Sequence, residues 1–293
     1  MHTKSLIESA VQTIRNRFSP EGDFAIYGNE FFRPDSTAWA VMALEVCSER
    51  RDLTLAACRR LAKSQLSDGR VAVIDAHPKS YWPTALSLMA WQMIGGFEKE
   101  TLLALQFLLT AFGKHWPKKQ DAAVSHDTSI RGWPWVENTH SWVEPTAMAV
   151  LALRACGYAQ HSRVSEAIKM ILDRQLPTGG WNYGNTTVYG KILRPNLACT
   201  GSALSSLSGQ VDQKEVELSI GYLHHQIQKI RTPLTLSWAI FGLTAWSNRP
   251  SDACEWILES LSFQKKYGVY NTVLLSQLVI AYVTSGDFRC LFD

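Results

Sequence analysis

Six segments of the chain are apolar on every side and rich in small residues. Each begins with Thr or Ser, and most end in Leu, Trp or Tyr. The clearest copies span residues 37–44, 84–91 and 146–153, and weaker copies begin at Thr200, Ser237 and Ser276. Helices without a polar face are usually buried. Each copy therefore predicts an interior helix whose Ala, Ser and Gly residues let its neighbours pack closely.

Amphipathic segments alternate with these copies, and their charges fall on one side, as expected of an outer and half-exposed layer. They span residues 5–18, 53–67, 101–112, 164–175, 216–229 and 254–263. Repeats that cannot bury their faces alone must close or stack. Six inner and six outer helices predict an all-α (α/α)6 toroid, formed by residues 1–293 as a single domain. An open solenoid is the alternative, but segment 272–284 is too apolar for the polar cap that a solenoid needs.

In such a ring the inner helices are parallel, so their N-termini share one rim. Four of the predicted helix starts lie near a proline: Pro34, Pro83, Pro145 and Pro233. Proline suits the first helical turn, where its missing N–H costs nothing. The rim is therefore the place to look for functional side chains.

Composition narrows the range of functions. The chain is 46% hydrophobic and 19% charged, and its 11 Trp residues predict an aromatic-rich interior or cavity. The net charge of +3 is too small, and Lys and Arg too scattered, for a nucleic-acid partner. Mild attraction to anionic substrates, or peripheral contact with a lipid membrane, stays open.

The six cysteines form no C-x-x-C pair and lie mostly among apolar residues, as expected of reduced thiols in a cytoplasmic protein. The N-terminus lacks the apolar core of a signal peptide, and no apolar stretch is long enough to span a membrane. Nucleotide-binding and nucleophile-elbow motifs are also missing, so no cofactor is expected.

Two segments carry a family resemblance. Residues 175–181, Gln-Leu-Pro-Thr-Gly-Gly-Trp, resemble the QW motif of squalene and hopene cyclases, and residues 65–69 look like a degraded copy with Arg70 in place of Trp. Residues 132–135, Gly-Trp-Pro-Trp, with the following 142–147, resemble the Gly-Trp-rich loop and D-x-D-D-T-A helix of the same family. The chain thus resembles the squalene-hopene cyclase and prenyltransferase α/α-toroid superfamily, the prenyltransferase and squalene oxidase repeat proteins.

The resemblance implies a site for acid-initiated chemistry on an isoprenoid, either a polyprene or a prenyl diphosphate. Trp142 stands at the first Asp of the motif, Glu144 at the middle Asp, which is the general acid of class II terpene cyclases, and Pro145 at the last. Glu144 is therefore the candidate catalytic acid, and apolar burial would raise its pKa. The alternative is an acidic residue placed at a helix N-terminus because the helix dipole favours it.

Other candidates should share the rim with Glu144. Arg33, Arg194 and Arg231 could form an anion site for a diphosphate at the helix N-termini. Asp35 is a further substrate-binding candidate, with N-capping as the commoner use of such a residue. Scattered surface arginines are the plainer interpretation.

Four tryptophans near the inner-helix starts could bind substrate and stabilise carbocations through their ring faces: Trp39, Trp82, Trp142 and Trp238. Core packing is the alternative. His126, Asp127, His140 and Cys199 match no zinc-site spacing, so no metal is expected. Two other functions compete with the enzyme hypothesis. One is a non-catalytic toroid that binds a lipid or protein partner. The other is an α/α-barrel carbohydrate enzyme using Asp35 and Glu144 as its carboxylate pair.

Overall fold

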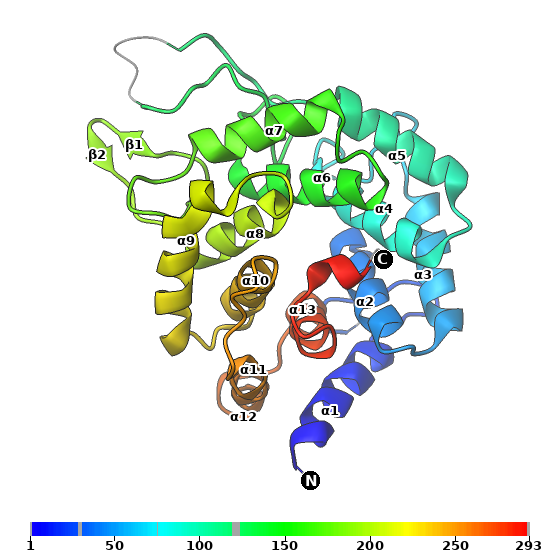
Figure 1. The fold of residues 1–293 in the computed structure, drawn as a ribbon. Helices are drawn as coiled ribbons and strands as arrows, with labels where there is room; N and C mark the ends of the chain where they lie inside the picture. Colours follow the sequence, from blue (N-terminus) through cyan, green and yellow to red (C-terminus); the bar gives the residue numbers. More distant parts are fainter. Residues whose placement is uncertain (1, 29–30, 75, 119–123, 292–293) are drawn as a thin grey trace.

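The computed structural model describes residues 2–28, 31–74, 76–118 and 124–291. Six helices form an inner ring: α2 (Pro34–Val46), α4 (Trp82–Ile94), α6 (Val143–Ala155), α8 (Leu197–Leu207), α10 (Pro233–Thr244) and α13 (Thr272–Val283). Six outer helices surround them: α1 (His2–Asn16), α3 (Arg51–Lys63), α5 (Glu98–Thr110), α7 (Ser162–Asp173), α9 (Gln213–Gln226) and α11 (Ala253–Ser262). Figure 1 shows the two concentric layers. The predicted all-α (α/α)6 toroid is confirmed.

The ring is closed between its first and last repeats. Each inner helix packs against the next, and α13 packs against α2. The guanidinium of Arg17, which follows α1, donates to Thr272 Oγ1 at 3.1 Å and to the Tyr270 carbonyl at 2.9 Å. The backbone N–H of Thr272 donates to the carbonyl of Ile26, just before α2, at 2.9 Å. The open solenoid is therefore excluded.

The inner helices are buried almost throughout, as their all-round apolar pattern predicts. Gly201 of α8 and Gly242 of α10 mark the closest approach. A Cβ on Gly201 would lie 2.1 Å from the Trp238 carbonyl oxygen, and one on Gly242 would lie 2.7 Å from the Gly201 backbone. Only glycine fits at either position.

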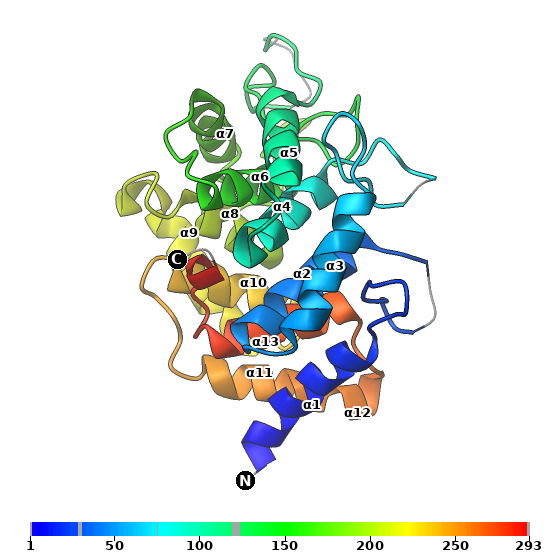
Figure 2. The same ribbon diagram turned by 90° about the vertical axis from the view of Figure 1, so that its right-hand side faces the viewer.

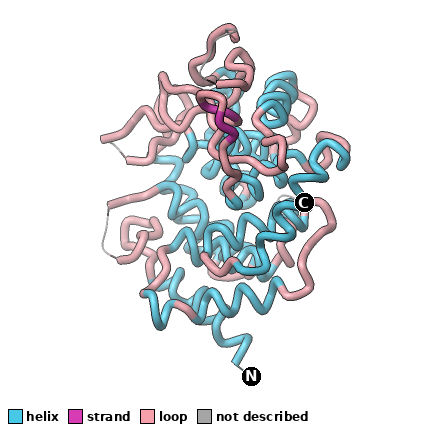
Figure 3. The backbone as a smooth tube through the Cα atoms, turned by 90° about the vertical axis from the view of Figure 1, so that its left-hand side faces the viewer, coloured by secondary structure: helices cyan, strands magenta, loops and turns pink. Residues whose placement is uncertain are grey.

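A threonine hydroxyl fastens four inner helices to the turns that precede them. Thr37, Thr84 and Thr146 each accept the backbone N–H of the residue 13 positions earlier, at 2.9–3.2 Å. Thr200 accepts the N–H of Trp181, 19 positions earlier, at 3.0 Å. The longer span contains the hairpin β1 (Thr187–Val188) and β2 (Lys191–Ile192), which lies among the loops in Figure 3. The Thr that opens these copies of the sequence repeat is thus a hydrogen-bonding device.

The QW-like segment ties its turn to the outer helices on either side. Trp181 Nε1 donates to the Ile171 carbonyl near the end of α7 at 2.7 Å, and Gln175 Nε2 donates to Ser219 Oγ of α9 at 2.7 Å. In the earlier copy, Gln65 Nε2 donates to the Glu100 carbonyl of α5 at 2.9 Å. Gln therefore ties each turn to the next outer helix.

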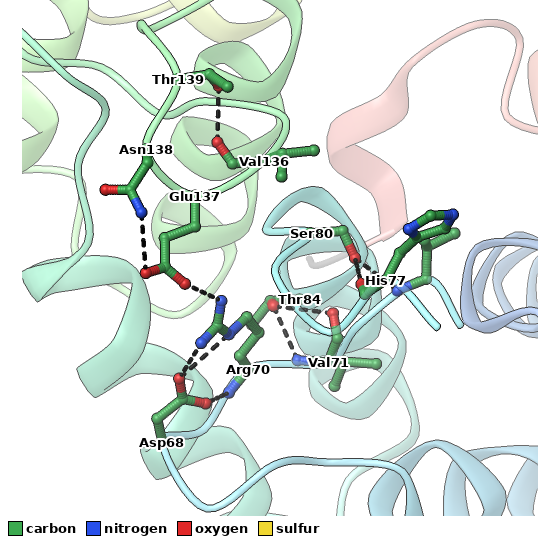
Figure 4. Close-up of polar contacts among 11 residues, drawn as sticks. Asp68, Arg70, Val71, His77, Ser80, Thr84, Val136, Glu137, Asn138 and Thr139 are labelled. Carbon is green, nitrogen blue, oxygen red and sulfur yellow. Dashed lines mark hydrogen bonds and ion pairs between the residues drawn. The ribbon is translucent and has the colours of Figure 1, made fainter. Parts of the chain in front are cut away.

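The structure corrects the alignment of Arg70 with the tryptophan of this motif. Val71, six residues after Gln65, occupies the position of Trp181, because its N–H donates to Thr84 as that of Trp181 donates to Thr200. Arg70 corresponds to Gly180. Its guanidinium pairs with Asp68 at 2.7 Å and with Glu137 at 3.1 Å, joining two rim loops (Figure 4).

Aromatic rings fill the middle of the toroid. Trp39 of α2 and Trp238 of α10 meet edge-to-face with centroids 6.1 Å apart, although α13 separates their helices in the ring. Phe288, in the short 3-10 helix η2 (Phe288–Leu291), lies 5.8 Å from Trp39, 5.9 Å from Trp238 and 5.0 Å from Phe241. The C-terminal segment, red in Figure 1, therefore reaches into the barrel and packs on its aromatic centre.

Among the described helices, none combines the length and the apolar character that crossing a membrane requires. The cysteines whose side chains the structure describes, Cys47, Cys58, Cys156, Cys199 and Cys254, are free thiols.

Candidate functional site

The N-termini of the inner helices gather at one rim, joined by hydrogen bonds between neighbouring repeats. The N–H of Tyr81, before α4, donates to the Trp135 carbonyl at 2.9 Å, and the N–H of Val143 in α6 donates to the Tyr183 carbonyl at 3.0 Å. Figure 2 shows the loops before α2 and α4 on one side of the toroid and the C-terminus on the other. The rim is thus the face opposite the C-terminal segment.

Glu144 lies in the first turn of α6, directly after Trp142 and Val143. Its side chain is half-buried, and among the described residues it has no hydrogen bond or ion pair. Burial raises the pKa of Glu144 to about 7, and no charged neighbour contributes to the shift. Burial raises the pKa of the Cys199 thiol, in the first turn of α8. The negative charge of ionised Glu144 nearby raises the pKa of Cys199 further. Glu144 is a carboxyl group that can carry a proton at neutral pH.

Aromatic side chains gather on the same rim as Glu144. The Trp142 ring packs on His140 with centroids 4.2 Å apart, and Trp82 meets Trp135 edge-to-face at 5.8 Å. Trp135 and Trp142 line a groove of about 430 Å³, together with Lys114, Trp116, Val136, Asn138, Thr139 and His140. The rim that carries Glu144 therefore also offers apolar and aromatic surface.

The three predicted anion-binding arginines form no common cluster. Arg33 makes a bidentate pair with Asp35, with both hydrogen bonds at 2.8 Å. Arg231 pairs with Glu259 of α11, donates to the Ile230 carbonyl and lies over the Trp256 ring at 5.0 Å. Arg194 is exposed, and its side chain forms no hydrogen bond or ion pair with a described residue. Arg231 thus faces the outer layer, and Arg33 is already neutralised.

Asp35 is not an N-cap. It lies in the first turn of α2, after Arg33 and Pro34, and its carboxylate accepts both hydrogen bonds from Arg33. No carboxylate, Asp35 included, contributes to the pKa shift of Glu144. A carbohydrate enzyme would need two carboxylates that face one cleft, and here Asp35 is held by Arg33.

Of the four predicted aromatic candidates, Trp82 and Trp142 lie half-buried at the rim, whereas Trp39 and Trp238 lie within the barrel. Trp39 and Trp238 are 3% and 2% exposed, so in this structure they pack on each other and on Phe288. For these two residues, core packing describes the observed contacts.

A second cluster was not expected from the sequence. His126 and Arg174 are both buried, and together with Lys114 and His140 they line a cavity of about 210 Å³. Arg174 follows α7 and carries no motif, so its inward position could not be read from the chain. No group of His, Cys, Asp and Glu in the described part of the protein is arranged to hold a metal ion.

Solved structures of two kinds of enzyme share this architecture. The type II terpene cyclase MstE from Scytonema, in complex with its substrate geranylgeranyl dihydroxybenzoate, aligns with a TM-score of 0.64 at 13% identity, covering 97% of each chain. A GH76 α-mannanase of Bacteroides thetaiotaomicron aligns with a TM-score of 0.64 at 8% identity, covering 100% of this chain and 98% of the mannanase. A novel α-amylase from Clostridium perfringens gives 0.61 at 10% identity, covering 95% and 97%.

No protein-family model matches the chain, and no curated protein matches its sequence. At identities this low the structural likeness shows the α/α-toroid fold alone. Which reaction the fold supports here must be argued from the site.

Proposed function

We propose that this protein transforms an isoprenoid by acid-initiated chemistry at the rim, with Glu144 as the proton donor. The observation that carries the proposal is a half-buried carboxyl group with a pKa of about 7 and no counter-charge, in the first turn of the inner helix that begins directly after Trp142. A general acid works best when its pKa lies near the working pH. The type II terpene cyclase fold supports the same assignment by analogy.

The neighbouring groups suit the charge that would develop. Proton transfer from Glu144 leaves positive charge on the substrate chain, and the faces of aromatic rings attract cations. Trp142 stands two residues before Glu144, at the start of α6, and Trp82 and Trp135 continue the aromatic surface of the rim. Once ionised, Glu144 can take a proton back from the cation and end the reaction.

The acid strength of Glu144 narrows the substrate class. A carboxyl group with a pKa near 7 is a weak acid, and Trp142 and Pro145 stand where class II cyclases have further carboxylates to polarise the acid. Oxygen atoms accept protons far more readily than alkene carbons. We therefore place isoprenoids with an epoxide first among the substrates, ahead of plain polyprenes and prenyl diphosphates.

The test is product formation by the purified protein, followed by gas chromatography with mass spectrometry. The panel contains epoxidised and plain polyprenes, farnesyl diphosphate and geranylgeranyl diphosphate. Wild type should convert at least one of these, Glu144→Gln should not, and Glu98→Gln, which changes an exposed carboxylate on α5, should behave as wild type. Equal turnover by Glu144→Gln, or no turnover of any substrate by wild type, would refute the proposal.

A second candidate function is a non-catalytic toroid that binds a lipid. The contacts among Trp39, Trp238 and Phe288 favour it, because they close the barrel to a chain that would have to fold inside it, whereas the rim groove lined by Trp135 and Trp142 stays open to a lipid. Native mass spectrometry distinguishes the two functions. Retained lipid that survives unchanged through the turnover assay supports binding alone.

A further inference from the structure

The cavity beside His126 is lined by basic and neutral groups. It has a volume of about 210 Å³ and lies between the loop before α6 and the residues that follow α7. Its polar lining comes from Lys114, His126, His140, Arg174 and uncharged residues, and none of its described lining residues is acidic. Sites for drug-sized ligands measure about 300–1,000 Å³. This cavity therefore suits a small group rather than a whole isoprenoid.

Arg174 is a buried cation with few partners. Its side chain is 4% exposed, and the guanidinium donates one hydrogen bond, from Nη1 to the Gly184 carbonyl at 2.9 Å. Nε has no hydrogen bond and lies 3.6 Å from the carboxylate of Asp173, which also accepts the Asp127 backbone N–H. A guanidinium has five donors, and a buried charge left partly unpaired is costly. An anion in the cavity would supply the missing acceptors.

His126 supports the same conclusion. It is 6% exposed, and its Nδ1 has no hydrogen-bond partner among the described residues. Burial, reinforced by the positive charges of Arg174, His140 and Lys118, lowers the pKa of His126 to about 4. The charges of Arg174, His140 and Lys118 thus disfavour a further cation beside His126, although Asp127 offsets part of their effect, and such surroundings favour an anion.

The cavity continues into the aromatic groove of the rim. Lys114, Trp116 and His140 line both hollows, and the groove extends over Trp135 and Trp142. A basic recess that opens onto an apolar groove matches a molecule with a charged end and an apolar body.

We propose that the cavity lined by Lys114, His126 and Arg174 binds the phosphate or carboxylate end of a small amphiphile whose apolar part lies along the Trp135–Trp142 groove. Lys114 would pair with the anion at the entrance, and the unused N–H groups of Arg174 would donate to it from below. The proposal does not depend on proton donation by Glu144, and its test involves no turnover.

The experiment measures binding by isothermal titration and by the thermal unfolding midpoint, at constant ionic strength held with sodium chloride. The probes are inorganic phosphate, acetate, benzoate and uncharged benzyl alcohol. At least one anion should bind saturably and raise the midpoint, since a ligand of the folded state alone stabilises it. Tighter binding of phosphate than of acetate would identify a phosphate end, and the reverse a carboxylate end. Benzoate should bind at least about fivefold more tightly than acetate, through the groove.

Three variants locate the site. Lys114→Met changes an exposed side chain and should weaken anion binding about fivefold or more. Arg174→Met should abolish it, with folding checked by circular dichroism. Lys169→Met removes an equal charge from the exposed face of α7 and should leave anion binding unchanged.

Three outcomes would overturn the proposal. One is wild type that binds neither phosphate nor any carboxylate beyond the chloride control. Another is Lys114→Met that binds anions as tightly as wild type does. Equal binding of benzoate and acetate would remove the apolar half of the proposed ligand.

Discussion

The threonine hydroxyls that fasten the inner helices allow a quantitative test of the fold. Thr84 is fully buried, and its Oγ1 accepts the Val71 N–H at 3.0 Å and lies 3.3 Å from the Val71 carbonyl. Valine has nearly the same shape but no hydroxyl. Thr84→Val therefore keeps the packing and leaves a buried N–H without a partner. Such a loss costs about 1–3 kcal/mol. Thr200→Val removes the acceptor for Trp181 N–H and should cost as much.

The assay is urea unfolding followed by circular dichroism, with the free energy of unfolding taken from the midpoint at constant slope. The two sites lie in different repeats and share no partner, so the double variant should lose about 2–6 kcal/mol, the sum of the two effects. Thr110→Val is the matched control, because Thr110 is exposed and its hydroxyl bonds only to carbonyls of its own helix. Unchanged stability in both buried variants would show that the hydroxyls do not hold the turns, and the explanation of the repeat would fail.

Three further predictions concern the site, the barrel centre and the helix contacts. The pKa of Glu144 in the folded protein lies above its ordinary value of 4.5, so the folded state retains a proton between pH 4.5 and about 7 and the stability that Glu144 contributes falls as pH rises through this window. Glu144→Gln should lack this loss, which is about 1–3 kcal/mol after allowance for partial exposure. If urea unfolding gave the two proteins the same change in free energy of unfolding between pH 5 and pH 8, the prediction would be contradicted. Phe288→Ala should cost about 3–5 kcal/mol and open an apolar space that binds benzene, detected by a rise in the thermal midpoint that wild type lacks. Gly201→Ala should cost about 3 kcal/mol by calorimetry, because its Cβ would overlap the Trp238 carbonyl, whereas Gly221→Ala, with open space around it, should not destabilise the protein.

The repeat pattern predicted the architecture because the same physical constraint recurs in each unit. An inner helix that is apolar all round has to be enclosed, and Thr146 and its equivalents mark where each helix begins. The predicted outer helices agree with the observed ones apart from shifts at their ends. What the pattern could not show was the purpose of the Thr, which depends on a turn 13 or 19 residues away.

The rim chemistry was only partly predictable. Glu144 stands out in the sequence because a motif surrounds it, and Trp142 precedes it by two residues at the start of α6. Arg231 also precedes an inner helix, but its side chain pairs with Glu259 of the outer layer. The local sequence pattern does not indicate which partner it will pair with. Arg174 gave no signal at all, since its role comes from burial next to a cavity formed by a distant loop. Hydrophobic periodicity does not predict a side chain whose role depends on residues far away in the sequence.

The magnitudes at Glu144 decide between its two interpretations. A helix N-terminus stabilises a negative charge by about 0.3–1 kcal/mol, which would lower the pKa of a carboxyl group by less than one unit. Burial acts in the opposite direction and prevails, raising the pKa from 4.5 to about 7. Glu144 is therefore about half protonated at neutral pH, just where the helix dipole would favour the ionised form. A residue kept only to complement the dipole would stay exposed, as Glu98 does at the start of α5. The position of Glu144 favours the holding of a proton over the capping of a helix.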